Sequence, residues 1–186
     1  MLRIFGIIFA GLIFSSYSFI YTNAGVFTAK ESSVSFISEA NLGKIKGASN
    51  ELKGTLDIQK RTFSFSLPVC SFQGFLNATQ KRHYCEKFVE VPKFPESGFK
   101  GKIIEDIDLT KAGVYKVRGK GMMLLHGSEQ EQIIDAQITV KEGEITIESI
   151  FQLPLEEHGI HVSKMNSLSM AKVINVNVKI LMKPEA

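Results

Sequence analysis

The chain has 186 residues with 22 Lys and Arg against 19 Asp and Glu, a formal net charge of +3, and 14 Phe but no Trp. Its basic side chains are scattered rather than gathered in one block, which argues against a nucleic-acid partner. The high Phe content indicates a large apolar interior.

The N-terminal residues 1–24 predict a signal peptide, because Arg3 is followed by an apolar run at 4–14 and by small residues before Gly25. That run is shorter than the ~18–20 residues of a membrane-spanning helix. The alternative is an uncleaved N-terminal anchor. We expect cleavage, a periplasmic or secreted location, and one domain over residues 25–186.

Alternation of apolar and polar side chains predicts eight strands in the rest of the chain. They span Ser32–Ala40, Lys46–Gln59, Thr62–Val69, Gly98–Ile104, Tyr115–Leu125, Gln132–Val140, Glu144–Leu153 and Ala171–Met182. The second and third form a hairpin across Lys60 and Arg61, and residues 127–130 form a turn. Gly119 and Gly121 share one strand face, which predicts a bend or the close approach of another group.

Eight strands at hairpin spacing, with scarcely any helical periodicity, indicate an all-β antiparallel barrel or sandwich. A closed barrel is favoured because closure removes the strand edges. The interior of an eight-stranded barrel is either filled by side chains or wide enough for one small ligand, and side-chain identity alone leaves both open.

One long segment, from Cys70 to Ile103, interrupts this strand pattern. It carries basic side chains and the aromatic residues Phe72, Phe75, Tyr84, Phe88, Phe94 and Phe99. Residues 78–89 have room for a short helix. Cys70 and Cys85 either pair across this segment or remain as two buried thiols.

The same segment resembles the YceI-like family of secreted bacterial proteins that bind polyisoprenoid or other long amphiphilic lipids. The matching motifs in SFQGFLNATQKRHYCEKFVEVPKFPESGFKGKI are Ser71-Phe72, His83-Tyr84, Phe94-Pro95 and Phe99 with Gly101. Downstream, VRGKGMMLLHGSEQEQIIDAQITV is similar to a further family module, with His126 and Gly127 at its paired positions.

The resemblance implies a lipocalin-like barrel that holds a lipid tail along an apolar bore, with the long aromatic loop and its short helix over one end. The predicted ligand-binding residues are Phe63, Phe65, Phe72, His83, Tyr84, Phe88, Phe94, Ile134, Ile138, Ile147, Phe151, Val176 and Val178. The expected partner is a long-chain isoprenoid or fatty amphiphile. We also expect transient contact with a membrane surface and a monomer or homodimer.

Other functions are weighed against this one. A secreted barrel with a solid core, acting in stress or partner binding, is the main alternative. His158 and His161 beside Glu156 and Glu157 are more typical of a solvated surface turn than of a metal site. Cys85 with His83 lacks an acidic group to orient the histidine. We therefore predict no catalytic residue, metal or cofactor.

Overall fold

In a computed structural model of the chain, the described residues are 25–41, 43–162 and 170–185. The predicted signal peptide lies outside the described residues. Within these described residues there are nine strands: β1 (Val26–Ala40), β2 (Gly43–Ser49), β3 (Lys53–Asp57), β4 (Thr62–Pro68), β5 (Glu96–Ile103), β6 (Gly113–Leu125), β7 (Ser128–Lys141), β8 (Glu144–Pro154) and β9 (Val173–Pro184). The helical segments are η1 (Val69–Ser71), α1 (Ala78–His83), η2 (Tyr84–Phe88) and η3 (Glu156–His158).

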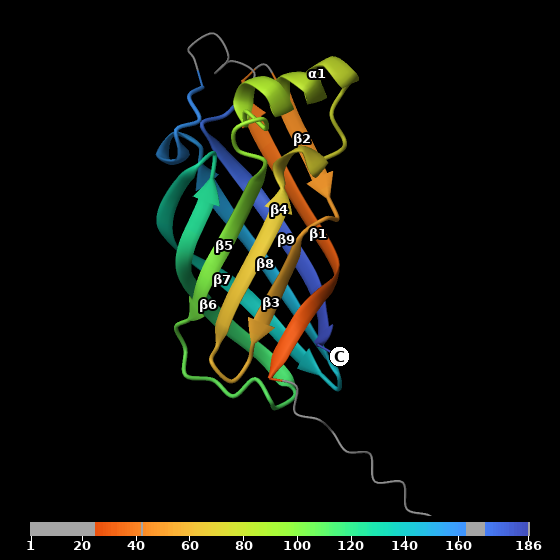
Figure 1. The fold of residues 1–186 in the computed structure, drawn as a ribbon, viewed down its shortest axis with the longest axis vertical. Helices are drawn as coiled ribbons and strands as arrows, with labels where there is room; N and C mark the ends of the chain where they lie inside the picture. The colour runs from red at the N-terminus through yellow and green to blue at the C-terminus, as the bar shows by residue number, and fades with distance from the viewer. Residues whose placement is uncertain (1–24, 42, 163–169, 186) are drawn as a thin grey trace, which may run out of the picture.

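These strands form one antiparallel sheet that closes through pairing of β1 with β9. Both β2 and β3 pair with the other edge of β1, β2 along residues 34–40 and β3 along residues 26–28. Together β2 and β3 therefore occupy one position of the barrel. The predicted antiparallel barrel of eight strand positions is confirmed (Figure 1).

The prediction of one continuous strand from Lys46 to Gln59 is wrong. The chain leaves the ladder at residues 50–52, where the Ser32 hydroxyl lies 3.0 Å from the carbonyl oxygen of Asn50 and 3.1 Å from that of Leu52. A side-chain donor thus replaces the backbone partner that a continuous ladder would supply. Before the break, β2 contacts the segment after β4 through a bridge of Ala48 to Gln73 and a hydrogen bond between the Ser49 and Ser71 hydroxyls at 2.6 Å.

The predicted turn at residues 127–130 is also misplaced. β6 and β7 pair as far as Leu125 and Ser128, so the turn is His126-Gly127. Both residues have positive φ, 51° and 72°. Two consecutive left-handed residues suit the right-handed twist of a hairpin, which is why a two-residue turn suffices.

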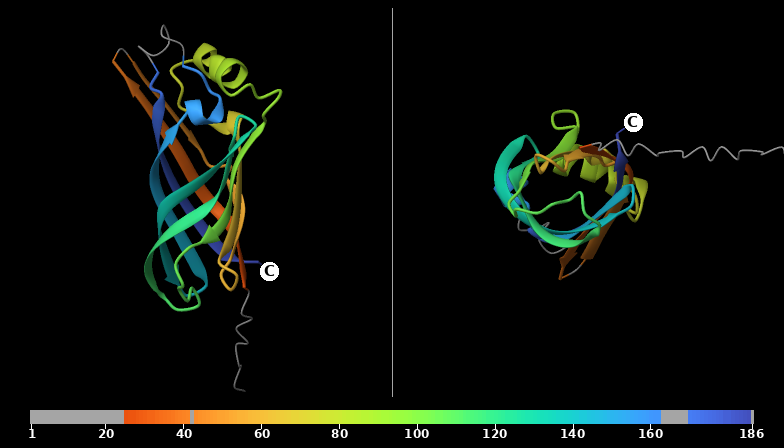
Figure 2. Two further views of the ribbon diagram at one scale, coloured as in Figure 1. Left: turned by 90° about the vertical axis from the view of Figure 1, so that its left-hand side faces the viewer. Right: turned by 90° about the horizontal axis from the view of Figure 1, so that it is seen from below.

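Apolar side chains fill the lower end of the barrel, as it is oriented in Figure 1. The cluster there includes Leu56, Ile145 and Met182, all nearly inaccessible to solvent. Leu109, from the loop between β5 and β6, is buried in the same cluster. Seen from below, this loop crosses the barrel end (Figure 2).

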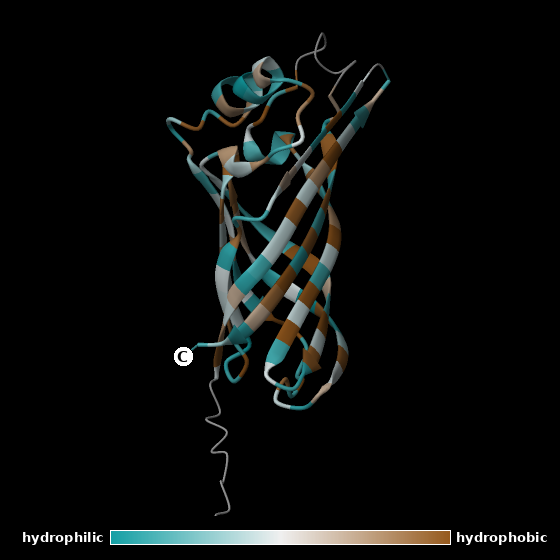
Figure 3. Ribbon diagram, turned by 90° about the vertical axis from the view of Figure 1, so that its right-hand side faces the viewer, coloured by the Kyte–Doolittle hydropathy of each residue, from teal (hydrophilic) through white to brown (hydrophobic). Residues whose placement is uncertain are grey.

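The alternation of apolar and polar residues along the strands is visible as brown and teal bands (Figure 3).

The long segment between β4 and β5 crosses the upper end (Figure 1). The short helix predicted within residues 78–89 is present as α1, which continues into the π-helical segment η2. The side chain of Asn77 caps α1 by accepting a hydrogen bond from the backbone N–H of Gln80 at 2.8 Å. An Asn cap satisfies a donor that the first helical turn leaves unpaired.

Candidate functional site

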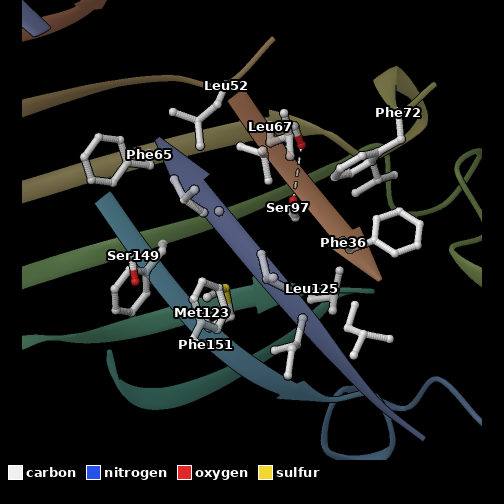
Figure 4. Close-up of a pocket in the computed structure, with 18 of the residues that line it drawn as sticks. Phe36, Leu52, Phe65, Leu67, Phe72, Ser97, Met123, Leu125, Ser149 and Phe151 are labelled. Atoms are coloured by element: carbon white, nitrogen blue, oxygen red, sulfur yellow. Dashed lines mark hydrogen bonds between the residues drawn. The ribbon is translucent and has the colours of Figure 1, made fainter. Parts of the chain in front are cut away.

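Above the lower cluster the barrel encloses a cavity of about 770 Å³. Small-molecule sites in proteins measure roughly 300–1,000 Å³, so this volume is that of a binding site rather than a packing defect. Its lining is mostly apolar, and strands around the whole barrel contribute to it. In Figure 4 the side chains of Leu52, Phe65, Met123 and Phe151 surround a common space.

Strand alternation explains why this surface is apolar. On β9 the residues Ile174, Val176, Val178 and Ile180 line the cavity, while Asn175 and its polar neighbours face outward and are exposed. At ~3.3 Å per residue this lining extends roughly 20 Å along the strand. Strands in a barrel tilt by about 35–45° from the barrel axis, so this lined length corresponds to a depth of about 15 Å along the axis. A depth of about 15 Å equals half the ~30 Å hydrocarbon core of a bilayer.

The sequence places most of its predicted binding residues in this lining. The cavity is bordered by Phe63, Phe65, Phe72, His83, Tyr84, Phe88, Ile134, Ile138, Ile147, Phe151, Val176 and Val178. That these residues contact a ligand stays a prediction. Their shared position in the cavity lining is observed.

Phe94 is the exception, because it lies outside the described cavity lining. Its ring packs edge-on against His126, with ring centroids 4.6 Å apart, and it covers Gly127 closely. His126 Nε2 lies 2.9 Å from Glu90 Oε2. Lys93 Nζ lies 2.7 Å from Glu90 Oε1. The hydrogen bond from Lys93, followed by the smaller effect of His126, holds the pKa of Glu90 below its ordinary value. Phe94 therefore fastens the upper segment to the β6–β7 turn.

Cys70 and Cys85 form a disulfide, with their Cα atoms 5.5 Å apart. Beside it, the Tyr84 hydroxyl donates to the Val69 carbonyl oxygen at 3.0 Å, and burial raises the pKa of Tyr84. The Tyr84 ring also stacks on Phe36. These contacts fix the upper segment onto the barrel. Since the Cys85 sulfur is bonded, it offers no free thiol for nucleophilic chemistry.

Polar groups gather at the upper end of the cavity. Asn77, Thr79, Gln80 and His83 border it from α1 and its cap, and His83 is exposed. Deeper in the bore, polar side chains are few. Ser97 donates to the Leu67 carbonyl oxygen at 3.3 Å (Figure 4). The cavity therefore has one polar end and one apolar end, which is the polarity of an amphiphile.

The YceI-like domain family matches residues 26–186. The chain belongs to the YceI-like family. Several solved structures share its fold at low sequence identity. No curated protein sequence matches the chain significantly.

A polyisoprenoid binding domain from Saccharophagus degradans, implicated in plant cell wall breakdown, has a TM-score of 0.72 at 9% identity and covers 86% of this chain and 98% of its own. For Burkholderia cenocepacia BcnA the TM-score is 0.65 at 13% identity, with 81% and 95% covered. For the Campylobacter jejuni YceI protein it is 0.63 at 16% identity, with 81% and 91% covered. At these identities the likeness shows a shared fold.

The interpretation of His158 as part of a solvated turn is wrong for this YceI-like barrel. His158 has no solvent exposure, whereas His161 is exposed. Neither ring nitrogen of His158 makes a hydrogen bond of ordinary geometry with a described residue. Burial lowers its pKa, with the Ser128 backbone and Glu157 acting in the opposite direction. The described residues hold no group of three His, Cys, Asp or Glu side chains arranged for a metal ion.

The predicted close approach at Gly119 and Gly121 is confirmed. A Cβ on Gly119 would lie 3.1 Å from the ring of Phe63, so that ring occupies the space of the missing side chain. Gly121 faces Gly101 on β5, and a Cβ there would lie 2.9 Å from the Gly101 Cα. Gly101 and Gly121 thus let the backbones of β5 and β6 approach closely.

Some lining residues were not predicted as ligand contacts. They include Phe36 on β1, Phe99 on β5, Met123 on β6, and Leu155, Ile160 and Met170 from the connection between β8 and β9. Strand alternation already placed Phe36 with Val34 on one face. The residues of the β8–β9 connection have no periodic pattern, so the sequence carries no signal for them.

Among the described residues, no helix is long and apolar enough to cross a membrane.

Proposed function

We propose that this YceI-like barrel binds and carries a long-chain amphiphile, an isoprenoid or a fatty lipid, without catalysing a reaction on it. The observation that carries the proposal is the cavity of about 770 Å³ with its apolar lining. A barrel with a solid core would not contain that space. The family membership and the polyisoprenoid-binding relative support the same role.

In this proposal the apolar chain lies along the bore and the polar end lies at the upper mouth. Each buried CH₂ contributes about 0.8 kcal/mol, so about ten of them give roughly 8 kcal/mol before the cost of ordering the chain. Tight binding thus needs few polar contacts. His83 and the amide and hydroxyl groups of Asn77, Thr79 and Gln80 are placed to contact the polar end.

A periplasmic or secreted location fits the same proposal. The disulfide between Cys70 and Cys85 suits an oxidising compartment, and the predicted signal peptide would deliver the chain there. A transient contact with a membrane surface would let the amphiphile move between bilayer and barrel.

The test is extraction of the purified protein with organic solvent followed by mass spectrometry. We expect a stoichiometric long-chain lipid from the wild type. Val178→Phe places a larger ring in the bore and should reduce the bound lipid several-fold, because it removes room for the chain. Asn175→Phe makes a comparable change on the outer face of the same strand and should leave the lipid content unchanged.

Two results would contradict the proposal. One is a wild-type protein that carries no lipid and takes up none when incubated with polyprenols or fatty acids. The other is an equal loss of lipid in both variants, which would place the bound lipid outside the bore.

A further inference from the structure

Strands β7 and β8 separate halfway along the barrel wall. Their pairing runs from Lys141 with Glu144 to Gln137 with Glu148 and stops there. Both strands continue upward, as residues 128–136 of β7 and residues 149–154 of β8. Each stays paired to its other neighbour along this length, β7 to β6 and β8 to β9. Along these two runs β7 and β8 are not paired with each other, and this stretch of the wall is here named the β7–β8 slot.

The inner cavity and an outer groove lie on the two sides of the wall beside this slot. The groove, of about 850 Å³, lies on the outer face of β6 to β9. Val117, Ala136 and Ser149 line both the inner cavity and the outer groove. Of these, Ala136 and Ser149 occupy the first register step beyond the last β7–β8 pair, at the lower end of the slot. There the Ser149 hydroxyl of β8 donates a hydrogen bond of 2.6 Å to the Asp135 carbonyl oxygen of β7.

The groove suits the passage of an uncharged chain. Its charged side chains balance in sign: Lys116, Arg118 and Lys179 against Glu105, Asp135 and Glu148. Two pairs are joined at 2.8 Å, Arg118 with Glu105 and Lys179 with Glu148. Ile150, 74% exposed, contributes an apolar surface beside the opening. Covering paired charges with a hydrocarbon chain costs less free energy than covering unpaired charges.

The upper end of the cavity is a poorer entrance. There the disulfide, the Tyr84 to Val69 hydrogen bond and the Glu90 to His126 contact all hold the upper segment on the barrel. Among the described residues of the connection after β8, Glu157 meets β7, where Gln132 Nε2 donates to Glu157 Oε2 at 3.4 Å. Its residues Leu155 and Ile160 lie over the cavity.

We propose that the β7–β8 slot is a lateral portal through which the long apolar chain of the ligand enters and leaves the barrel. This inference rests on the proposed lipid binding and adds the route. A sideways opening lets a long chain enter along its length rather than thread through the fastened upper end. The polar end of the ligand stays at the upper mouth.

The experiment bridges the slot chemically and measures rates. Continuing the β7–β8 register places Ile133 opposite Gln152, and both side chains are exposed outside the barrel. In Ile133→Cys/Gln152→Cys a short bis-maleimide links the two strands across the slot. In the control, Thr139→Cys/Thr146→Cys, the same reagent links a registered pair on the same strands where they are already joined. Mass spectrometry verifies both links, and the reagent leaves the native disulfide intact.

Uptake and release of cis-parinaric acid, a fluorescent long-chain fatty acid, are followed by stopped flow. We expect the bridged slot to slow both rates about tenfold, as for a blocked entrance, and the bridged control to stay within about twofold of the wild type. Ser149→Ala removes the hydrogen bond to Asp135 and should speed exchange. It provides a second readout should the double variant fail to fold.

The outcomes separate the route from the binding. Normal binding with unchanged rates in the bridged slot variant and in Ser149→Ala would overturn the portal and leave the lipid-binding proposal intact. Equal slowing in the slot and control variants would do the same. A wild-type protein that binds no probe and yields no lipid would overturn both.

Discussion

Two facing glycines, Gly101 and Gly121, allow β5 and β6 to approach more closely than side chains would permit. A methyl group on Gly121 would overlap the Lys100 carbonyl oxygen and lie 2.9 Å from the Gly101 Cα. These are backbone atoms that can move only if the ladder distorts. Gly119 differs, because its nearest neighbour is the Phe63 ring at 3.1 Å, which borders the open cavity and can shift into it.

Substitution of these glycines should therefore have unequal effects on stability. We expect Gly121→Ala to lower the free energy of unfolding by about 2–4 kcal/mol, and Gly119→Ala by less than about 1 kcal/mol. Chemical denaturation of both variants measures the difference. Equal losses would mean that the Gly101–Gly121 approach is not a constraint on the barrel.

His158 is a second residue whose surroundings predict a measurable effect. It is inaccessible to solvent, and burial lowers its pKa below the ordinary histidine value of 6.5. The unfolded chain therefore binds a proton at a pH where the folded chain does not. The free energy of unfolding is therefore not reduced by His158 above about pH 6.5. It decreases as the pH falls from there toward the pKa of His158 in the folded protein.

We expect His158→Phe to remove this part of the pH dependence. Thermal unfolding at about pH 8 and at about pH 5 should show a larger fall in Tm for the wild type than for His158→Phe. His161→Phe, at an exposed position on the same connection, is the control and should keep the wild-type difference. If His158→Phe has the same pH dependence as the wild type, the histidine is not buried as a neutral group.

At the scale of elements, the disulfide joins η1 to η2 across a separation of 15 residues. In the chain-entropy account, closing a loop of this size stabilises the folded state by about 3 kcal/mol. Cys70→Ser/Cys85→Ser should lose roughly that amount. Tyr84→Phe keeps the disulfide and removes one hydrogen bond, so it should lose about 1 kcal/mol.

Amide hydrogen exchange locates the effect of the disulfide. Without it, we expect faster exchange in residues 70–95 and unchanged exchange in β6 and β9, because the barrel ladders do not depend on the link. Faster exchange throughout the barrel would show instead that the upper segment is needed for the fold as a whole.

The elements that follow strand alternation could be predicted from the sequence, and those set by single contacts could not. Residues such as Val176 and Val178 were identified as inward because a strand has a period of two. At the break between β2 and β3, the backbone carbonyl groups accept hydrogen bonds from the Ser32 hydroxyl, which is distant in sequence. Likewise, the sequence predicts Phe94 as a ligand contact in the bore, whereas its ring packs on His126. No local pattern predicts such partners.

At the scale of the whole molecule, the barrel combines a filled lower end with a hollow above it. Apolar walls that face an empty cavity lose the packing contacts of a filled core, which lowers the stability of the unliganded protein. A bound chain restores these contacts. The stability of the barrel should therefore depend on ligand.

We expect the Tm of lipid-free wild-type protein to rise with the concentration of added fatty acid, by an amount equivalent to about 2.7 kcal/mol at 100 times Kd. Val178→Phe should behave differently, because its ring fills part of the cavity. It should start from an equal or higher Tm without lipid and respond less to ligand. Asn175→Phe, on the outer face, should respond as the wild type does. If Val178→Phe instead lowers the lipid-free Tm and keeps the full response, the cavity at this level is too tightly packed to admit the ring, and the bound chain lies elsewhere.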